Sequence, residues 1–272
     1  MNILYFAIGN SILIHLQAMF ALRTAYIHKG KDDVIYVMTD SPALYGNLSF
    51  VNTIPVTEED INVWKGKDNY FFRAKICAIQ KFVSLHADSH LLYLDCDTYI
   101  YGDLWDIRKR LDAGTGVMHK DEGSMANMPG ASGEMWHQTK GKNFAGIAIE
   151  EKYHMWNSGV YAVPQSCLSD VVHTSLCLCD EFLNAGVTCF NLEQWGGAIS
   201  LIRFAGSIES AEKTVGHYWH HKEIWSQYIS LFFLKSAKRG WTIDEEIKRI
   251  ACVNLSHLRK RLAVMRAIRK IF

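Results

Sequence analysis

The chain contains few of the features that mark disordered, disulfide-bonded or membrane-spanning proteins. Its 272 residues include only four prolines and no low-complexity run, which argues against long disordered linkers. The seven cysteines are scattered and form no C-x-x-C motif or zinc-ligand spacing, so we expect reduced thiols in a cytosolic protein. No apolar stretch is long enough for a transmembrane helix, and the apolar N-terminus lacks the basic region of a signal peptide. These absences favour a folded protein that is soluble or peripheral to a membrane.

Net charge is low for the whole chain but unevenly distributed. The formal charge of +1 at pH 7 gives no indication of a nucleic-acid partner. Residues 235–272 hold eleven lysines and arginines against three acidic residues, a net of +8 that leaves −7 for residues 1–234. Within this tail, residues 248–270 place apolar residues and cations at helical spacing. The pattern is typical of a basic amphipathic helix on an anionic membrane, and equally of a terminal helix packed on its domain.

Apolar patterning predicts an α/β fold. We expect strands at 2–8, 34–38, 47–55, 91–94, 144–149 and 156–163, and helices at 11–28, 70–86 and 168–185. Strand, helix and strand over residues 2–38 form a βαβ unit, which implies a parallel sheet with a right-handed crossover. Ligands of such sheets bind beyond the carboxyl ends of the strands. We expect a long loop at 120–142, which either faces an acceptor or has no role, and an active-site loop at 191–197.

The most informative stretch is Leu91–Ile100, in which an apolar strand ends in two carboxylates one residue apart. In a strand, Asp95 and Asp97 would point to the same face, where bare carboxylates repel each other. A divalent cation bound with a substrate diphosphate removes that repulsion, because Mg²⁺ and Mn²⁺ prefer carboxylates, phosphate oxygens and water. The pattern therefore predicts a metal–diphosphate site. The alternative is that the two aspartates lie on the surface at the end of a strand and bind no ligand.

Other polar residues could bind the same ligand. Arg73 opens the helix before the aspartate strand, where its guanidinium could reach a diphosphate or be an ordinary charge on a helix face. Asn157 and Ser158 could bond sugar hydroxyls or simply cap a turn. His217 offers an imidazole and Lys222 a cation for phosphate, and the alternative for this segment is an aromatic-rich surface loop.

The order of these segments resembles a known family. In chain order they are Arg73, Leu92–Asp97 (L-Y-L-D-x-D), Asn157–Val160 (N-S-G-V), Glu193–Gln194 and His217–Trp225. The chain resembles metal-dependent GT-A glycosyltransferases and is most similar to glycosyltransferase family eight and its bacterial relatives. The resemblance covers roughly residues 1–230, and the order is more specific than any single motif.

The resemblance implies a GT-A fold, a Rossmann-like single domain with a mixed, mostly parallel sheet over residues 1–234, followed by a basic helical tail over 235–272. It implies a retaining enzyme that moves a hexose of the galactose or glucose type from a nucleotide-diphosphate sugar, with UDP favoured and Mn²⁺ or Mg²⁺ as cofactor. The acceptor would be a glycan or a lipid-linked glycan. With the basic tail, this favours bacterial surface-polysaccharide synthesis in the cytoplasm, with peripheral contact to the inner membrane through 248–270.

Site residues are implied by the same resemblance. Asp95, Asp97 and His217 would hold the metal, and Glu193 and Gln194 would flank the anomeric carbon. The donor-binding residues would be Ala7, Asn10, Arg73, Cys96, Asn157, Ser158 and Lys222. The chain departs from the family pattern in three places: Glu193 replaces an aspartate, the segment before Lys222 lacks a glycine, and the first strand lacks the acidic residue that reads the base. Asn10 is the nearest substitute for that residue.

Three other classes of protein share part of this pattern. A phosphatase of the haloacid-dehalogenase type also places D-x-D after an apolar strand, but Tyr99 stands where a threonine or valine is normal. A nucleotidyltransferase would carry a glycine-rich basic loop near the N-terminus, for which Gly9-Asn10-Ser11 is a poor match. A non-catalytic sugar-binding module would not need this set of four side chains together: Asp95, Asp97, Glu193 and His217.

Overall fold

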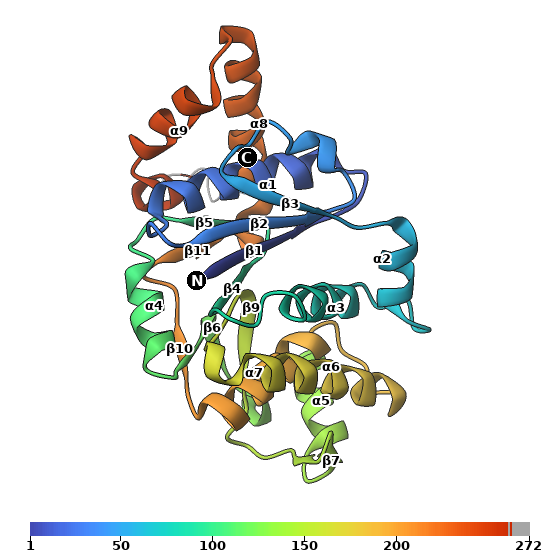
Figure 1. The fold of residues 1–272 in the computed structure, drawn as a ribbon. Helices are drawn as coiled ribbons and strands as arrows, with labels where there is room; N and C mark the ends of the chain where they lie inside the picture. The colour runs from blue at the N-terminus through green and yellow to red at the C-terminus, as the bar shows by residue number, and fades with distance from the viewer. Residues whose placement is uncertain (261, 263–272) are drawn as a thin grey trace, which may run out of the picture. The chain divides into compact units, whose positions relative to one another are not determined.

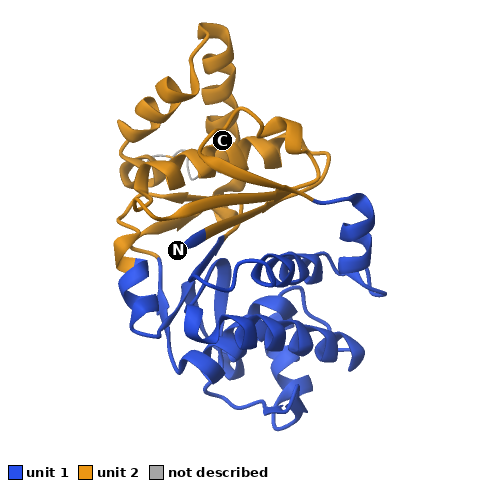
Figure 2. Ribbon diagram, viewed as in Figure 1, with its two compact units in different colours: residues 1–2, 56–93, 107–211 blue, residues 3–55, 94–106, 212–272 orange. Residues whose placement is uncertain are grey.

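A computed structural model describes residues 1–260 and 262. The described chain divides into two compact units (Figure 2). Unit 1 comprises residues 1–2, 56–93 and 107–211, and unit 2 comprises residues 3–55, 94–106 and the described residues from 212 onward. Each unit is therefore assembled from segments that are distant in the sequence.

Unit 1 contains four neighbouring strands in the order β10-β6-β9-β4 (Figure 1). Their bounds are Ile208–Ser210 (β10), Gly116–Ser124 (β6), His154–Val163 (β9) and Leu91–Leu94 (β4), whose last residue belongs to unit 2. Strands β10 and β6 are parallel, whereas β6 and β9 are antiparallel with irregular register. All four residues of β4 are buried, as expected for an apolar run covered on both faces.

Unit 1 contains six helices in the described chain. They are Glu58–Lys65 (α2), Phe71–Val83 (α3), Trp105–Asp112 (α4, which begins in unit 2), Gly130–Thr139 (α5), Leu168–Asn184 (α6) and Leu192–Ala205 (α7), with a short hairpin of Asn143–Phe144 (β7) and Ile147–Ala148 (β8). Helices α5, α6 and α7 contribute buried residues to one apolar cluster. Helices α6 and α7 contact each other through buried side chains, among them Phe182 stacked on Trp195 at 5.6 Å. Helix α2 is capped by Thr57, which forms a reciprocal capping box with Asp60.

Unit 2 contains the first βαβ unit of the chain and its last helices. Its elements are Asn2–Ala7 (β1, except Asn2), Ile12–His28 (α1), Val34–Thr39 (β2), Val51–Pro55 (β3), Thr98–Ile100 (β5), Val215–His217 (β11), Lys222–Arg239 (α8) and Ile243–Ala251 (α9). Strands β2 and β3 are parallel, and β5 and β11 form an antiparallel pair. Helix α1 contacts β2, β5, α8 and α9. Its Phe20 belongs to an aromatic core with Tyr99, Tyr218 and Trp225.

Most strands and helices lie where the sequence predicts them, but the two expected loops are wrong. Residues 120–142 contain the end of β6 and helix α5 instead of a continuous loop. Residues 191–197 form the start of helix α7, so the polar residues of this segment are on a helix. The segment 191–197 suggested a loop because Gly196 and Gly197 are poor helix formers. Here they give room for close packing, since an added β-carbon would lie 3.3 Å from the Ser175 carbonyl oxygen and 3.1 Å from the Tyr161 ring.

The predicted tail begins inside a helix, because α8 runs from Lys222 to Arg239 across residue 235. Of the predicted membrane segment, residues 261 and 263–270 lie outside the described residues. In its described part, Ile250, Leu255 and Leu262 are buried in the core of unit 2. Among the described residues, no helix is both long and apolar enough to cross a membrane.

Candidate functional site

Strand pairing in unit 2 brings the predicted metal ligands together. Strand β4 ends at Leu94, and the next residues turn into β5, where the Thr98 hydroxyl donates to the Asp95 carbonyl oxygen at 2.7 Å. Asp95 and Asp97 therefore lie in a turn and not within one strand. Strand β11 pairs with β5 so that His217 lies opposite Thr98. This pairing places a histidine from far along the chain beside the two aspartates.

Asp95, Asp97 and His217 form a cluster in which one ligand atom from each residue lies within 4.8 Å of the others. The imidazole Nε2 of His217 is 3.2 Å from Asp97 Oδ1, and Lys222 Nζ is 3.0 Å from Asp97 Oδ2. Two carboxylates and an imidazole at this spacing fit a single divalent ion, and Asp97 is largely buried. The ammonium of Lys222 is half exposed and adds a positive charge at the same place.

The electrostatics of Asp97 favour the ionised carboxylate. Burial alone would raise the pKa of Asp97, but the hydrogen bond and charge of His217, together with Lys222, hold that pKa well below its usual value. Burial likewise would lower the pKa of Lys222, but the negative charges of Asp97 and Asp95 raise it. The carboxylate is therefore deprotonated and ready to coordinate a cation at neutral pH.

An aromatic stack joins the three segments that carry these residues. Tyr99 follows Asp97 by two residues, Tyr218 follows His217, and Trp225 follows Lys222 by three; all three aromatic residues are almost fully buried. The Trp225 ring stacks on Tyr99 at 4.6 Å and on Tyr218 at 4.9 Å between centroids. Their hydroxyl and indole N–H groups have no hydrogen-bond partner among the described residues. Trp225 is part of the core of unit 2.

The loop after β1 is braced by residues that the sequence analysis did not identify. The Gly9 N–H donates to Asp40 Oδ2 at 2.7 Å, from the end of β2. The ring of His15 bridges Gly9 and Tyr45, with 2.9 Å to the Gly9 carbonyl oxygen and 2.9 Å to the Tyr45 hydroxyl. Gly9 has φ of +103°, a conformation that favours glycine. These contacts fix the turn and leave the predicted donor residue Asn10 exposed.

The other two predicted donor residues of this region lie next to the same turn. Ala7 is the last residue of β1 and is fully buried. The Cys96 thiol donates to the Phe6 carbonyl oxygen at 3.3 Å. Cys96 thereby ties the aspartate turn to the end of β1 within unit 2.

In unit 1, Ser158 connects the predicted catalytic residues. Its backbone N–H donates to Gln194 Oε1 at 3.0 Å, and its hydroxyl donates to Glu193 Oε1 at 3.2 Å. Lys75 Nζ donates to the Ser158 hydroxyl at 3.0 Å and to its carbonyl oxygen at 3.1 Å. The same ammonium lies 3.8 Å from Glu193 Oε1, and both side chains are about 6% exposed. Ser158, Glu193 and Gln194 thus form one buried polar network.

Glu122 extends this network and links it to Asn157. Asn157 Nδ2 donates to Glu122 Oε1 at 3.2 Å, and Gln194 Nε2 donates to Glu122 Oε2 at 3.1 Å. The Tyr70 hydroxyl donates to Glu193 Oε2 at 3.1 Å, and burial followed by the charge of Glu193 raises the pKa of Tyr70. Sequence reasoning missed Glu122 because it lies in the segment interpreted as a loop.

The sequence analysis also missed Lys75. Lys75 follows Arg73 by two residues on the same helix, and side chains two residues apart on a helix do not face each other. Arg73, by contrast, is bound to Asp180, with Nε at 2.5 Å and Nη2 at 3.0 Å from the two carboxylate oxygens, and its Nη1 donates to the Trp64 carbonyl oxygen. The hydrogen bonds to Asp180 raise the pKa of Arg73. Within unit 1, Lys75 and not Arg73 contacts the polar network.

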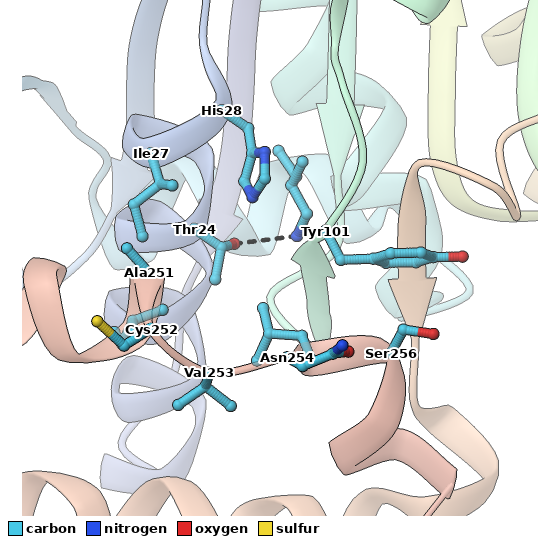
Figure 3. Close-up of a pocket in the computed structure, with 12 residues that line it drawn as sticks. Thr24, Ile27, His28, Tyr101, Ala251, Cys252, Val253, Asn254 and Ser256 are labelled. Carbon is cyan, nitrogen blue, oxygen red and sulfur yellow. Dashed lines mark hydrogen bonds between the residues drawn. The ribbon is translucent and has the colours of Figure 1, made fainter.

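A cavity of about 490 Å³ lies elsewhere in unit 2 (Figure 3). It is lined by Thr24, His28 and Tyr101 together with residues 250–256. None of the predicted site residues lines it. The hydroxyl of Thr24 accepts a hydrogen bond from the Ile100 N–H at 3.0 Å, which is drawn in Figure 3.

Comparisons with known proteins show similarity in structure but not in sequence. No protein-family model matches the chain, and no curated protein matches it. The chain is similar to the solved structure of galactosyltransferase LgtC in complex with donor and acceptor sugar analogs, with 15% identity, coverage of 78% of this chain and 73% of that chain, and a TM-score of 0.50. It is similar to an active-site mutant of LgtC with 15% identity, coverage of 78% and 72%, and a TM-score of 0.51.

At 15% identity this similarity shows the fold. The GT-A fold predicted from the sequence is confirmed, with a mixed set of strands and flanking helices. Residue roles and substrates are not carried over from LgtC by the similarity in fold.

Proposed function

We propose that the protein is a metal-dependent glycosyltransferase that moves a hexose from a nucleotide-diphosphate sugar to an acceptor. The observation that carries this proposal is the cluster of Asp95, Asp97 and His217 with the ammonium of Lys222 beside it. The cluster combines three side chains of metal-ligand type with a cation that can bind phosphate. The GT-A fold supports the proposal by analogy.

Unit 2 would bind the nucleoside diphosphate. A Mn²⁺ or Mg²⁺ ion held by Asp95, Asp97 and His217 would supply Lewis-acid stabilisation of the charge that develops on the leaving diphosphate. Lys222 stabilises the same charge as a fixed cation. In the proposal, Ala7, Asn10 and Cys96 bind the nucleoside, and uridine is the favoured base. Arg73, in unit 1, remains a predicted donor-binding residue, and binding would require it to share its guanidinium with Asp180.

Unit 1 would bind and activate the sugar. Positive charge develops on the sugar ring as the diphosphate leaves, and the carboxylate of Glu193 and the amide oxygen of Gln194 are the groups that stabilise it. Ser158 and Lys75 hold Glu193 in place through the contacts described above. Asn157 binds a hydroxyl of the donor sugar. We propose retention of the anomeric configuration, with a hexose of the galactose or glucose type.

The acceptor in this proposal is a glycan or lipid-linked glycan of a bacterial surface polysaccharide such as lipopolysaccharide. The protein would work in the cytoplasm, with peripheral contact to the inner membrane through residues 248–270. The net charge of +8 over residues 235–272 supports this contact.

The direct test is hydrolysis of a panel of nucleotide-sugars by the purified protein, with Mn²⁺ and with chelator, in the absence of acceptor. We expect slow, metal-dependent release of a nucleoside diphosphate and a free hexose. Release of inorganic phosphate from phosphate monoesters would indicate a phosphatase, and synthesis of nucleotide-sugar from a sugar phosphate and a nucleoside triphosphate would indicate a nucleotidyltransferase. Donor binding without any turnover would indicate a sugar-binding module.

A further inference from the structure

The cavity of about 490 Å³ in unit 2 lies at the opposite end of β5 from the metal cluster (Figure 3). Asp97 directly precedes this strand of three residues, whereas Ile100 ends it and Tyr101 follows it. Ile100 and Tyr101 both line the cavity. Its volume falls within the range of about 300–1,000 Å³ that is usual for small-molecule sites. The cavity is therefore large enough for a ligand and separate from the residues proposed to bind the donor.

The wall of the cavity carries no formal charge at pH 7. Of the residues that the structure describes there, none is a lysine, arginine, aspartate or glutamate. His28 is half-buried, and burial lowers its pKa although the charge of Asp103 acts in the opposite direction. The imidazole is therefore neutral, with one nitrogen that donates and one that accepts. A phosphate or carboxylate ligand would find no cation on this wall.

Hydrogen-bonding groups lie on two sides of the cavity. Asn254 Oδ1 accepts from the His257 N–H at 2.8 Å, which fixes the side chain and leaves its NH₂ group to donate to a ligand. The hydroxyl of Ser256 is exposed and can donate or accept. In Figure 3, Asn254 and Ser256 lie across the cavity from His28. A pure hydrocarbon ligand is disfavoured, because these polar groups would lose water without a replacement partner.

Apolar and aromatic groups form the rest of the wall. The aliphatic side chains are Ile27, Ile100, Ile250, Val253 and Leu255. The half-exposed Tyr101 adds an aromatic ring, whose hydroxyl donates to the Glu212 carbonyl oxygen and whose centroid lies 5.9 Å from that of Tyr99. These contacts hold the ring in place, so binding beside it needs little reordering. Such a wall fits a ligand that has an apolar face as well as hydroxyl groups.

We propose that this cavity binds a neutral hexose unit of a glycan and is a second carbohydrate site, separate from the metal cluster. The C–H groups of the sugar lie against Tyr101 and the aliphatic side chains. Its hydroxyls bond to the imidazole of His28, the amide of Asn254 and the hydroxyl of Ser256. The site holds a glycan on unit 2 without metal and without donor. The inference goes beyond the proposed function and does not depend on transfer at the metal cluster.

Cys252 gives a direct reporter of occupancy. It lines the cavity and is exposed, whereas the other six cysteines are buried or half-buried. The test is alkylation of the full chain by iodoacetamide in chelator, followed by mass spectrometry, with and without maltotriose, cellobiose or melibiose. We expect at least one of these neutral sugars to slow modification of Cys252. Saturation-transfer NMR with the same sugars measures binding independently.

Two kinds of variant locate the bound sugar. Ala251→Phe should abolish binding, because Ala251 is exposed at the end of α9 and a large side chain there fills the cavity. His28→Phe/Ser256→Ala should weaken binding about tenfold through lost hydrogen bonds. Ala237→Phe is the matched control, since Ala237 is an exposed alanine near the end of α8 that does not line this cavity. Thermal unfolding of each variant checks that it is folded.

Three results would overturn the proposal. One is that wild type binds none of the three sugars. Another is protection of Cys252 that persists in Ala251→Phe, which would assign the sugar to the cavity beside Trp241 that Cys252 also lines. The third is tighter binding of glucose 1-phosphate or uridine than of the neutral sugars in chelator. Asp97→Asn should keep the protection of Cys252 and lose metal-dependent hydrolysis, so failure of this site and failure of the proposed function are separate results.

Discussion

Gly216 packs directly against the ring of Tyr99, one residue before the histidine of the metal cluster. A β-carbon at Gly216 would lie 2.2 Å from Tyr99 Cζ and 2.5 Å from its hydroxyl oxygen. The Tyr99 ring cannot move aside easily, because it is fully buried and stacked on Trp225. The contact fixes the spacing of β5 and β11, and with it the positions of Asp97 and His217.

We predict that Gly216→Ala destabilises the protein by about 1–3 kcal/mol, the usual cost of overpacking a core. It should also weaken Mn²⁺ binding, because the displaced strands carry the ligands. Thermal unfolding and a Mn²⁺ titration measure the two effects. Gly46→Ala is the control, since an added β-carbon there meets only an ordinary contact at 3.7 Å. Unchanged metal affinity in a destabilised Gly216→Ala protein would show that the stack does not position the cluster.

A second prediction concerns the buried pair of Lys75 and Glu193. Lys75→Met removes the ammonium and leaves Glu193 buried with a reduced set of partners, so we expect a loss of about 3–5 kcal/mol in the free energy of unfolding. Glu193→Gln should cost less, and the double variant should be more stable than Lys75→Met alone. Denaturant unfolding of the four proteins measures the coupling. Additive losses would mean that the two groups do not interact across their 3.8 Å separation.

Kinetics should distinguish the role of Glu193 from simple donor binding. Glu193→Ala is expected to lower turnover far more than donor affinity, because the positive charge it stabilises exists chiefly in the transition state. Donor affinity is measured by calorimetry and turnover by donor hydrolysis. A matched loss of affinity with unchanged turnover would assign Glu193 to ground-state binding.

The cap of α9 predicts a specific pH dependence of stability. The hydrogen bond from the Thr242 backbone lowers the pKa of Glu245 below its usual value. A carboxyl whose pKa is depressed by folding stabilises the protein above its unfolded pKa and loses this contribution as pH falls through the folded pKa. Glu245→Gln should therefore be less stable than wild type at pH 7, and the difference should shrink in acid. A difference that stays constant between pH 7 and pH 3 would contradict this origin.

The sequence predicted the βαβ unit and the apolar strand before the two aspartates, because each depends on local pattern. It did not predict that Asp95 and Asp97 lie in a turn after that strand. The apolar run of Leu91–Leu94 and the carboxylates after it are visible without any tertiary information. The convergence of His217 with Asp97 was available only from family resemblance. It depends on the pairing of β11 with β5 across more than a hundred residues, which no local pattern encodes.

Errors arose where tertiary packing overrides local preference. Gly196 and Gly197 suggested a loop, yet they lie in α7, where small residues admit the neighbouring helix and the Tyr161 ring. Lys75 and Glu122 were overlooked since a single charged residue on an otherwise ordinary element carries no signal of its partners. Their partners are visible only in the structure, where Lys75 donates to the Ser158 hydroxyl and Glu122 accepts from the Gln194 amide.

The most direct measurement is a Mn²⁺ titration of the full chain in the presence of a nucleoside diphosphate, followed by electron paramagnetic resonance of the free ion. Wild type should remove the free-Mn²⁺ signal with one site per chain, and Asp97→Asn should bind at least about 100-fold more weakly while keeping its fold. Asp103→Asn, an exposed aspartate of the same unit, should bind as wild type does. Equal Mn²⁺ affinity of Asp97→Asn and wild type, or no binding by either, would contradict a metal–diphosphate site at Asp95, Asp97 and His217.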